Sequence, residues 1–99
     1  MANKKVTIML DNNLIQVCPD PVYVSVSGKD QVVWEIEPNH DFDVIFPKNE
    51  PFKDYKFHGR KGTPAPSGEA KDGTQHKHYK YTIQIADVPP LDPTVRPIP

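Results

Sequence analysis

Apolar and polar residues alternate in short runs along the chain. The clearest run is 31–37, where Val32, Trp34 and Ile36 share one parity and the other parity is mostly polar. Successive side chains of a β-strand point to opposite faces, so this pattern predicts a strand with one buried and one solvated face. Similar alternation marks two further predicted strands, at 22–26 and 41–46.

Turn-forming residues separate these runs and argue against long helices. The chain has 12 prolines, which cannot donate to a sheet ladder and which interrupt helices. No uninterrupted segment is long enough for a convincing amphipathic helix. The remaining apolar runs predict further strands, at 4–10, 14–18, 76–85 and 92–98. About seven short strands without repeats or a domain boundary predict one all-β sandwich domain over residues 1–99.

Residues 47–75 are polar and show no clear alternation. We expect a long irregular loop there, and loops of this length in a compact domain are either functional or mobile. Binding residues are often carried by loops on a rigid scaffold. The aromatic and basic side chains of this region are therefore the candidate binding surface: Phe52, Tyr55, Phe57, Arg60 and Lys61.

The charge balance bears on the kind of partner. The 12 basic and 13 acidic side chains are intermixed and leave a formal net charge of −1. Because no basic stripe is available to contact phosphates, nucleic-acid binding has little electrostatic support. We expect a protein or small-molecule partner instead.

The first residues and the cysteine count bear on location. The apolar run at 6–10 is too short for a signal-peptide core or for a membrane span. Cys18 is the only cysteine, so no internal disulfide is possible. We therefore expect a cytoplasmic protein that does not enter membranes. An exposed edge strand would permit a weak homodimer as well as a monomer.

Three stretches carry a resemblance to a known family: Gly28-Lys29-Asp30-Gln31-Val32-Val33-Trp34, His40-Asp41-Phe42-Asp43-Val44-Ile45-Phe46 and Tyr79-Lys80-Tyr81-Thr82-Ile83. They are similar to the cupredoxins, the small Greek-key sandwiches of blue-copper proteins such as plastocyanin. The first resembles the turn and strand before the first copper ligand. The third resembles the aromatic-rich strand that leads to the copper cysteine.

The resemblance does not extend to the copper ligands. A type 1 site needs two histidines, a thiolate and a weak axial ligand such as methionine. The family takes most of these from the loop before its last strand, and residues 82–91 contain no Cys, His or Met. Ile83 stands where the family has its cysteine. The first-histidine position falls on His40 or, in the alignment that we prefer, on Phe42. The resemblance therefore implies a copper-free bacterial member without an assigned role.

Histidines offer an alternative function. His76 and His78 lie two residues apart on the predicted strand 76–85, so both rings are expected on its polar face. Such a pair supplies two of the four ligands that Zn²⁺ prefers, or binds Cu²⁺. His40 and His58 would add ligands if loops bring them close. Solvated histidines among lysines are the simpler interpretation.

Other reactive residues have structural interpretations. Trp34 shares parity with Val32 and Ile36, which predicts a core position. Cys18 has no cationic neighbour in sequence and is expected to be a small buried or edge residue. The acidic residues around the turn Pro38-Asn39 can perform acid–base chemistry, although outward-facing acids on strands usually provide solubility. They are Glu35, Glu37, Asp41 and Asp43.

No matched nucleophile, base and oxyanion donor can be named, so we do not expect an enzyme. The sequence favours a non-catalytic, cofactor-free, cupredoxin-like module that binds a protein or a small molecule. Metal binding through the surface histidines is the alternative.

Overall fold

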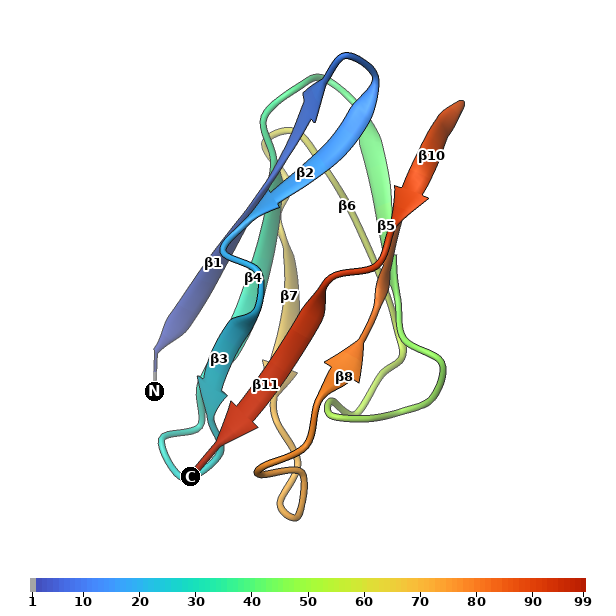
Figure 1. Cartoon of the computed structure of the whole chain (residues 1–99). Coiled ribbons are helices and arrows are strands. Elements are labelled where there is room, and N and C mark those ends of the chain that lie inside the picture. The colour runs from blue at the N-terminus through green and yellow to red at the C-terminus, as the bar shows by residue number, and fades with distance from the viewer. Residues whose placement is uncertain (1) are drawn as a thin grey trace.

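The computed structural model describes residues 2–99, which form eleven β-strands and no helix (Figure 1). The strands are β1 (Asn3–Asp11), β2 (Leu14–Cys18), β3 (Val22–Ser25), β4 (Gln31–Ile36), β5 (Asp41–Ile45), β6 (Lys56–Arg60), β7 (Ala65–Glu69), β8 (Tyr79–Lys80), β9 (Thr82–Ile85), β10 (Val88–Leu91) and β11 (Thr94–Ile98). The prediction of an all-β, sandwich-like fold is confirmed. Over the same residues there is no apolar helix of membrane-spanning length.

The strands form three sheets. Their orders are β2-β1-β4-β7, β10-β9-β5-β6 and β3-β11-β8. Only Tyr81 separates β8 from β9, so the second and third sheets run into one another. Two pairs are parallel, β1 with β4 and β3 with β11, and the other pairs are antiparallel. Parallel neighbours cannot be joined by a tight hairpin, so other strands intervene between β1 and β4 and between β3 and β11.

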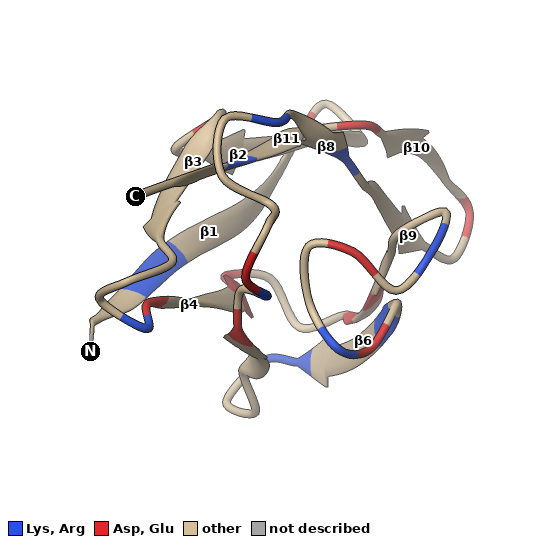
Figure 2. Cartoon of the chain, turned by 90° about the horizontal axis from the view of Figure 1, so that it is seen from below, with Lys and Arg blue, Asp and Glu red and all other residues tan. Residues whose placement is uncertain are grey.

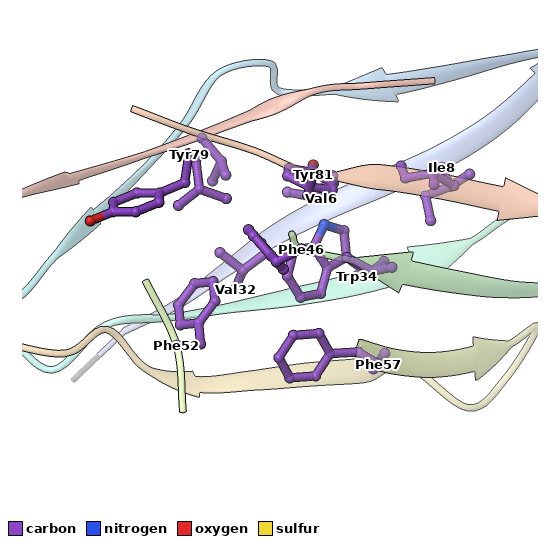
Figure 3. Packing of buried hydrophobic residues seen from close by; sticks show 14 of the residues in the cluster. Val6, Ile8, Val32, Trp34, Phe46, Phe52, Phe57, Tyr79 and Tyr81 are labelled. Carbon is purple, nitrogen blue, oxygen red and sulfur yellow. The ribbon is translucent and has the colours of Figure 1, made fainter. Parts of the chain in front are cut away.

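An aromatic cluster fills the centre of the core (Figure 3). The ring centroid of Trp34 lies 5.4 Å from those of Phe57 and Tyr81. Phe46 and Phe52 complete the cluster, with their centroids 5.6 Å apart and their rings nearly perpendicular. Tilted and edge-to-face contacts of this kind add to the burial of apolar area. The predicted core position of Trp34 is confirmed.

The prediction of an irregular loop at 47–75 is wrong, because this region contains β6 and β7. On β6 the inward residues are Phe57 and Gly59. Gly59 lies directly opposite Phe42 in the β5–β6 ladder, and a Cβ there would stand 2.5 Å from Cζ of that ring. The glycine makes room for the phenylalanine, and its missing side chain hid the strand from the hydropathy pattern.

β7 was missed for a similar reason. Its inward residues are Ala65 and Ser67, both small. The buried Ser67 Oγ accepts a hydrogen bond from the Val32 N–H at 2.9 Å and donates to the Gly68 carbonyl oxygen at 2.8 Å. A polar residue with satisfied hydrogen bonds can thus occupy a core-facing position that the pattern marks as solvated.

The prediction of one continuous strand at 76–85 is also wrong. Only Tyr79–Lys80 and Thr82–Ile85 are strands, and the residues before Tyr79 form turns. His76 has a φ of 67°, in the left-handed region, and its N–H donates to the Pro97 carbonyl oxygen. Between the predicted strands 76–85 and 92–98, Val88–Leu91 forms a further edge strand, β10.

Candidate functional site

An open cleft of about 830 Å³ lies where β5 begins and β9 ends. The start of β5 is at the upper end of the molecule in Figure 1. We call it the β5 cleft. Its lining comes from the start of β5, from the middle of β6 and from the β9–β10 hairpin. The lining residues are Asn39, His40, Asp41, Phe42, Asp43, His58, Gln84, Ile85, Ala86, Val88 and Pro90.

Three polar side chains form a row across the strands of this cleft. Asp43 lies directly opposite His58 on β6 and directly opposite Gln84 on β9. Directly opposed residues of antiparallel strands project to the same face of the sheet, so the three side chains are neighbours. The His58 Nδ1 lies 2.7 Å from the Asp43 Oδ1. This contact fixes the imidazole orientation and leaves Nε2 as the free ring nitrogen.

The other side of the β5 cleft is apolar. Ile85, Ala86, Val88 and Pro90 all belong to the β9–β10 hairpin. Ile85 is buried, Val88 is half-buried, and the other two are exposed. The cleft therefore presents hydrogen-bonding groups from β5 and β6 and aliphatic groups from the hairpin. Its lining includes Asp41 and Asp43 but no Lys or Arg, although Arg60 lies opposite Asp41 in the β5–β6 ladder.

The four histidines do not gather in one place. His40 and His58 line the β5 cleft, whereas His78 lines a different cleft next to β8, and His76 lies in a turn. The same-face strand pair predicted for His76 and His78 does not form, because the strand begins only at Tyr79. Within residues 2–99, no group of three or more His, Cys, Asp or Glu side chains is arranged to hold a metal ion.

The predicted binding surface at 52–61 is only partly exposed. Phe52 is fully buried and Phe57 is 9% exposed, since both pack in the aromatic cluster around Trp34. The prediction is wrong for these two residues. Both belong to the core, because β6 and the segment before it pack against the rest of the sandwich. Tyr55, Arg60 and Lys61 are exposed, as expected.

The predicted acidic set is divided between two sheets. Glu35 lies on β4 and pairs with Lys5 at 3.4 Å, whereas Asp41 and Asp43 lie on β5. Cys18 is exposed at the end of β2, an edge strand of its sheet. Its edge position agrees with the expectation.

Two of the positions that the resemblance aligns with copper ligands are apolar and inaccessible, whereas the alternative first-histidine position, His40, is exposed. Ile83 is fully buried and Phe42 is 1% exposed. Each belongs to the hydrophobic core, Phe42 over Gly59 and Ile83 opposite Val44 in the β5–β9 ladder. Hydrophobic packing thus fills these two positions.

Sequence reasoning missed the part of the β5 cleft that comes from Gln84 and the hairpin. It also missed the contact between Asp43 and His58, although both residues were singled out separately. The partner strand of β5 was taken for a loop, so no register could place His58 beside Asp43. The signal available in the sequence was the alternation of the polar residues Lys56, His58 and Arg60 with Phe57 and Gly59.

Comparison with protein-family models gives no match to this chain, and neither does comparison with curated proteins.

Proposed function

We propose that this chain is a non-catalytic binding module that takes a small organic molecule in the β5 cleft. The observation that carries the proposal is the division of the cleft lining. β5, β6 and Gln84 contribute hydrogen-bonding groups, and the β9–β10 hairpin contributes aliphatic groups. Ligand sites typically combine apolar surface with a few convergent polar groups, in clefts of about 300–1,000 Å³. A molecule with one polar and one apolar side matches this lining.

The row of Gln84, Asp43 and His58 would fix the orientation of the ligand. Gln84 offers an amide donor and acceptor, and Asp43 keeps lone pairs beyond the one that faces His58. The His58 ring is held by Asp43 at 2.7 Å, so its free nitrogen projects from a defined position. Groups oriented before binding lose little freedom when the ligand arrives, which favours affinity.

Binding is favoured over catalysis by what surrounds the Asp43–His58 pair. In such a pair the carboxylate orients the histidine, which can then act as a general base. The cleft lining offers it no Ser, Thr, Cys or Lys side chain to activate as a nucleophile. Of the acidic residues that the sequence groups around one turn, Glu35 lies on β4, in a different sheet from Asp41 and Asp43 on β5, so the whole set cannot act together.

We further propose that the module is cupredoxin-like and lacks a type 1 copper site. The stretches that carry the resemblance lie on β4, β5 and β8–β9, and each contributes to the core. Burial of Ile83 and Phe42 supports the absence of copper ligands at the aligned positions. The single thiol, Cys18, is on β2 and is not among the residues of the β5 cleft.

A fragment screen by thermal shift, run in parallel on wild type and on His58→Ala/Gln84→Ala, tests the proposed function. The exposed pair of His58 and Asp43 contributes at most about 1 kcal/mol to stability, so the variant is expected to fold. Lys61→Ala serves as the matched surface control. We expect fragments that raise the melting temperature of wild type and of the control but not of the cleft variant. Fragments that stabilise all three proteins equally, or none of them, would contradict the proposal.

A further inference from the structure

A second cleft opens beside β8, at the end of β5 opposite the β5 cleft. The β5–β9 ladder ends with the pair Ile45 and Thr82. Beyond this pair, the N–H groups of Phe46 and Tyr81 face away from one another, as alternate N–H groups of a strand do, toward the neighbours on their other sides. The Phe46 N–H donates to the Tyr55 carbonyl oxygen at 2.7 Å, and the Tyr81 N–H donates to the Pro93 carbonyl oxygen at 3.0 Å.

The ladder does not resume beyond this point because Pro47 has no N–H to donate. The segment after β5 and the strand β8 therefore diverge, and a cleft of about 490 Å³ lies between them. We call it the β8 cleft. Its lining residues are Pro47, Lys48, Glu50, Lys77, His78, Tyr79 and Lys80.

The lining of the β8 cleft is cationic, in contrast to the whole chain. Lys48, Lys77 and Lys80 are exposed and line it together with one acidic residue, Glu50. The chain as a whole carries a net charge of −1. Figure 2 views the molecule from this end and shows basic positions beside β8. The lining thus carries three lysines against one acid, and this excess of positive charge attracts an anion.

The single acid of the cleft is already engaged. The Tyr79 hydroxyl donates to the Glu50 Oε1 at 3.0 Å, and the Lys48 Nζ lies 3.8 Å from the Glu50 Oε2. Burial, followed by the contact with Glu50, raises the pKa of Tyr79, so its hydroxyl stays a donor at neutral pH. Glu50 is thereby held against Tyr79 and Lys48, whereas Lys77 and Lys80 have no such acidic partner among the lining residues.

We propose that the β8 cleft binds a small molecule that carries two or more anionic groups, either phosphates or carboxylates. Lys77 and Lys80, which have no acidic partner in the lining, would each contact an anionic oxygen, and Lys48, which already faces Glu50, would contribute from the other wall. The site is separate from the β5 cleft and does not depend on the function proposed for it, because the two clefts share no lining residue.

Titration of the ¹⁵N-labelled protein at low salt tests this site, with pyrophosphate and citrate as the two probes. Saturable shifts of the amide resonances of residues 48–50 and 77–80 are the expected result. A response to pyrophosphate alone assigns the site to phosphates, and a response to citrate alone assigns it to carboxylates. If neither probe gives saturable shifts there, the proposal is overturned.

Matched variants separate a site from the effect of net charge. Lys77→Gln/Lys80→Gln removes two positive charges from the cleft, and Lys4→Gln/Lys61→Gln removes two exposed charges outside its lining. We expect the first variant to bind at least about fivefold more weakly, the effect of losing two solvent-exposed ion pairs, and the second to stay close to wild type. Equal weakening by both variants would overturn the proposal. Unchanged amide resonances outside the cleft verify that each variant is folded.

Discussion

Gly59 on β6 lies directly beneath the Phe42 ring on β5, so close that a Cβ on the glycine would stand 2.5 Å from the Phe42 Cζ. The backbone carbonyl oxygen of Thr63 would lie 3.1 Å from the same Cβ and limits the space further. We expect Gly59→Ala to destabilise the fold by about 1–3 kcal/mol, because an extra methyl must displace a core ring. Urea unfolding measures this change.

Gly62 is the matched control for that substitution. Its φ is +82°, and nothing lies within 4 Å of the position that a Cβ would take. Gly62→Ala therefore tests the cost of backbone strain alone, expected to be about 1 kcal/mol. If Gly59→Ala is no more destabilising than Gly62→Ala, the close packing of Phe42 on Gly59 is wrong.

The same pair of residues explains how much of the fold the sequence could predict. The early strands and β5 were found because large apolar residues such as Val32, Trp34 and Phe42 occupy their inward positions. β6 and β7 were not, because Gly59, Ala65 and Ser67 occupy theirs. A hydropathy pattern reflects the apolar area of each side chain. These side chains have little apolar area, although they are buried.

The candidate site was predictable only in parts. Sequence reasoning singled out Asp43 as one of a set of acids and His58 as one of a set of histidines. Their 2.7 Å contact depends on the β5–β6 register, which depends on a strand that was not predicted. The position of β8 likewise depends on long-range pairing, because β8 pairs with β11.

Asp30 gives the fold a pH-dependent contribution. Its carboxylate accepts hydrogen bonds from the Ser25 N–H at 3.0 Å and from the Ala2 N–H at 3.1 Å. The bond from Ser25 lowers the pKa of Asp30 below the ordinary value of 3.8, against the opposing effect of burial. A lowered pKa in the folded state means that this contribution is complete above about pH 4 and is lost as the pH falls through the folded pKa.

We therefore expect Asp30→Asn to lower the free energy of unfolding by about 1–3 kcal/mol at neutral pH. The asparagine has only one acceptor oxygen, so one of the two backbone N–H groups faces an NH₂ group and loses its acceptor. The difference from wild type should shrink as the pH falls below about 4, when Asp30 itself becomes protonated. Unfolding by urea at neutral and at acidic pH gives both differences. A difference that stays constant over that range would contradict the role assigned to the ionised carboxylate.

Tyr79 and Tyr81 provide a matched pair of hydroxyls. The Tyr79 hydroxyl donates to Glu50, whereas the Tyr81 hydroxyl and the Trp34 indole N–H are buried without a partner at hydrogen-bonding geometry among the described residues. Burial raises the pKa of Tyr81 far above its ordinary value, and the nearby Trp34 indole offsets this only in part.

Removal of each hydroxyl should have different consequences. Tyr79→Phe is expected to cost about 0.5–1.5 kcal/mol, the value of a typical hydrogen bond, and Tyr81→Phe is expected to be neutral or stabilising. Thermal unfolding of the two variants makes the comparison. A larger loss for Tyr81→Phe than for Tyr79→Phe would mean that the Tyr81 hydroxyl has a partner after all.

The positions of the histidines lead to a prediction about metals. Because His76 lies in a turn and His78 lines the β8 cleft, they do not form the same-face pair that the sequence suggested. We expect calorimetric titrations with Zn²⁺ and Cu²⁺ to give the same heats for wild type and for His76→Ala/His78→Ala. A saturable Zn²⁺ isotherm that disappears in the double variant would reinstate the metal-binding hypothesis.

Mapping of a bound fragment on the protein tests the proposed function of the β5 cleft most directly. A fragment with one polar and one aliphatic side, titrated into ¹⁵N-labelled protein, should shift the amide resonances of Asp43, His58, Gln84, Ala86 and Val88 together. The shifts should saturate, and they should be lost in His58→Ala/Gln84→Ala. If every fragment that binds shifts residues outside this cleft, or leaves these five unchanged, the β5 cleft is not the binding site.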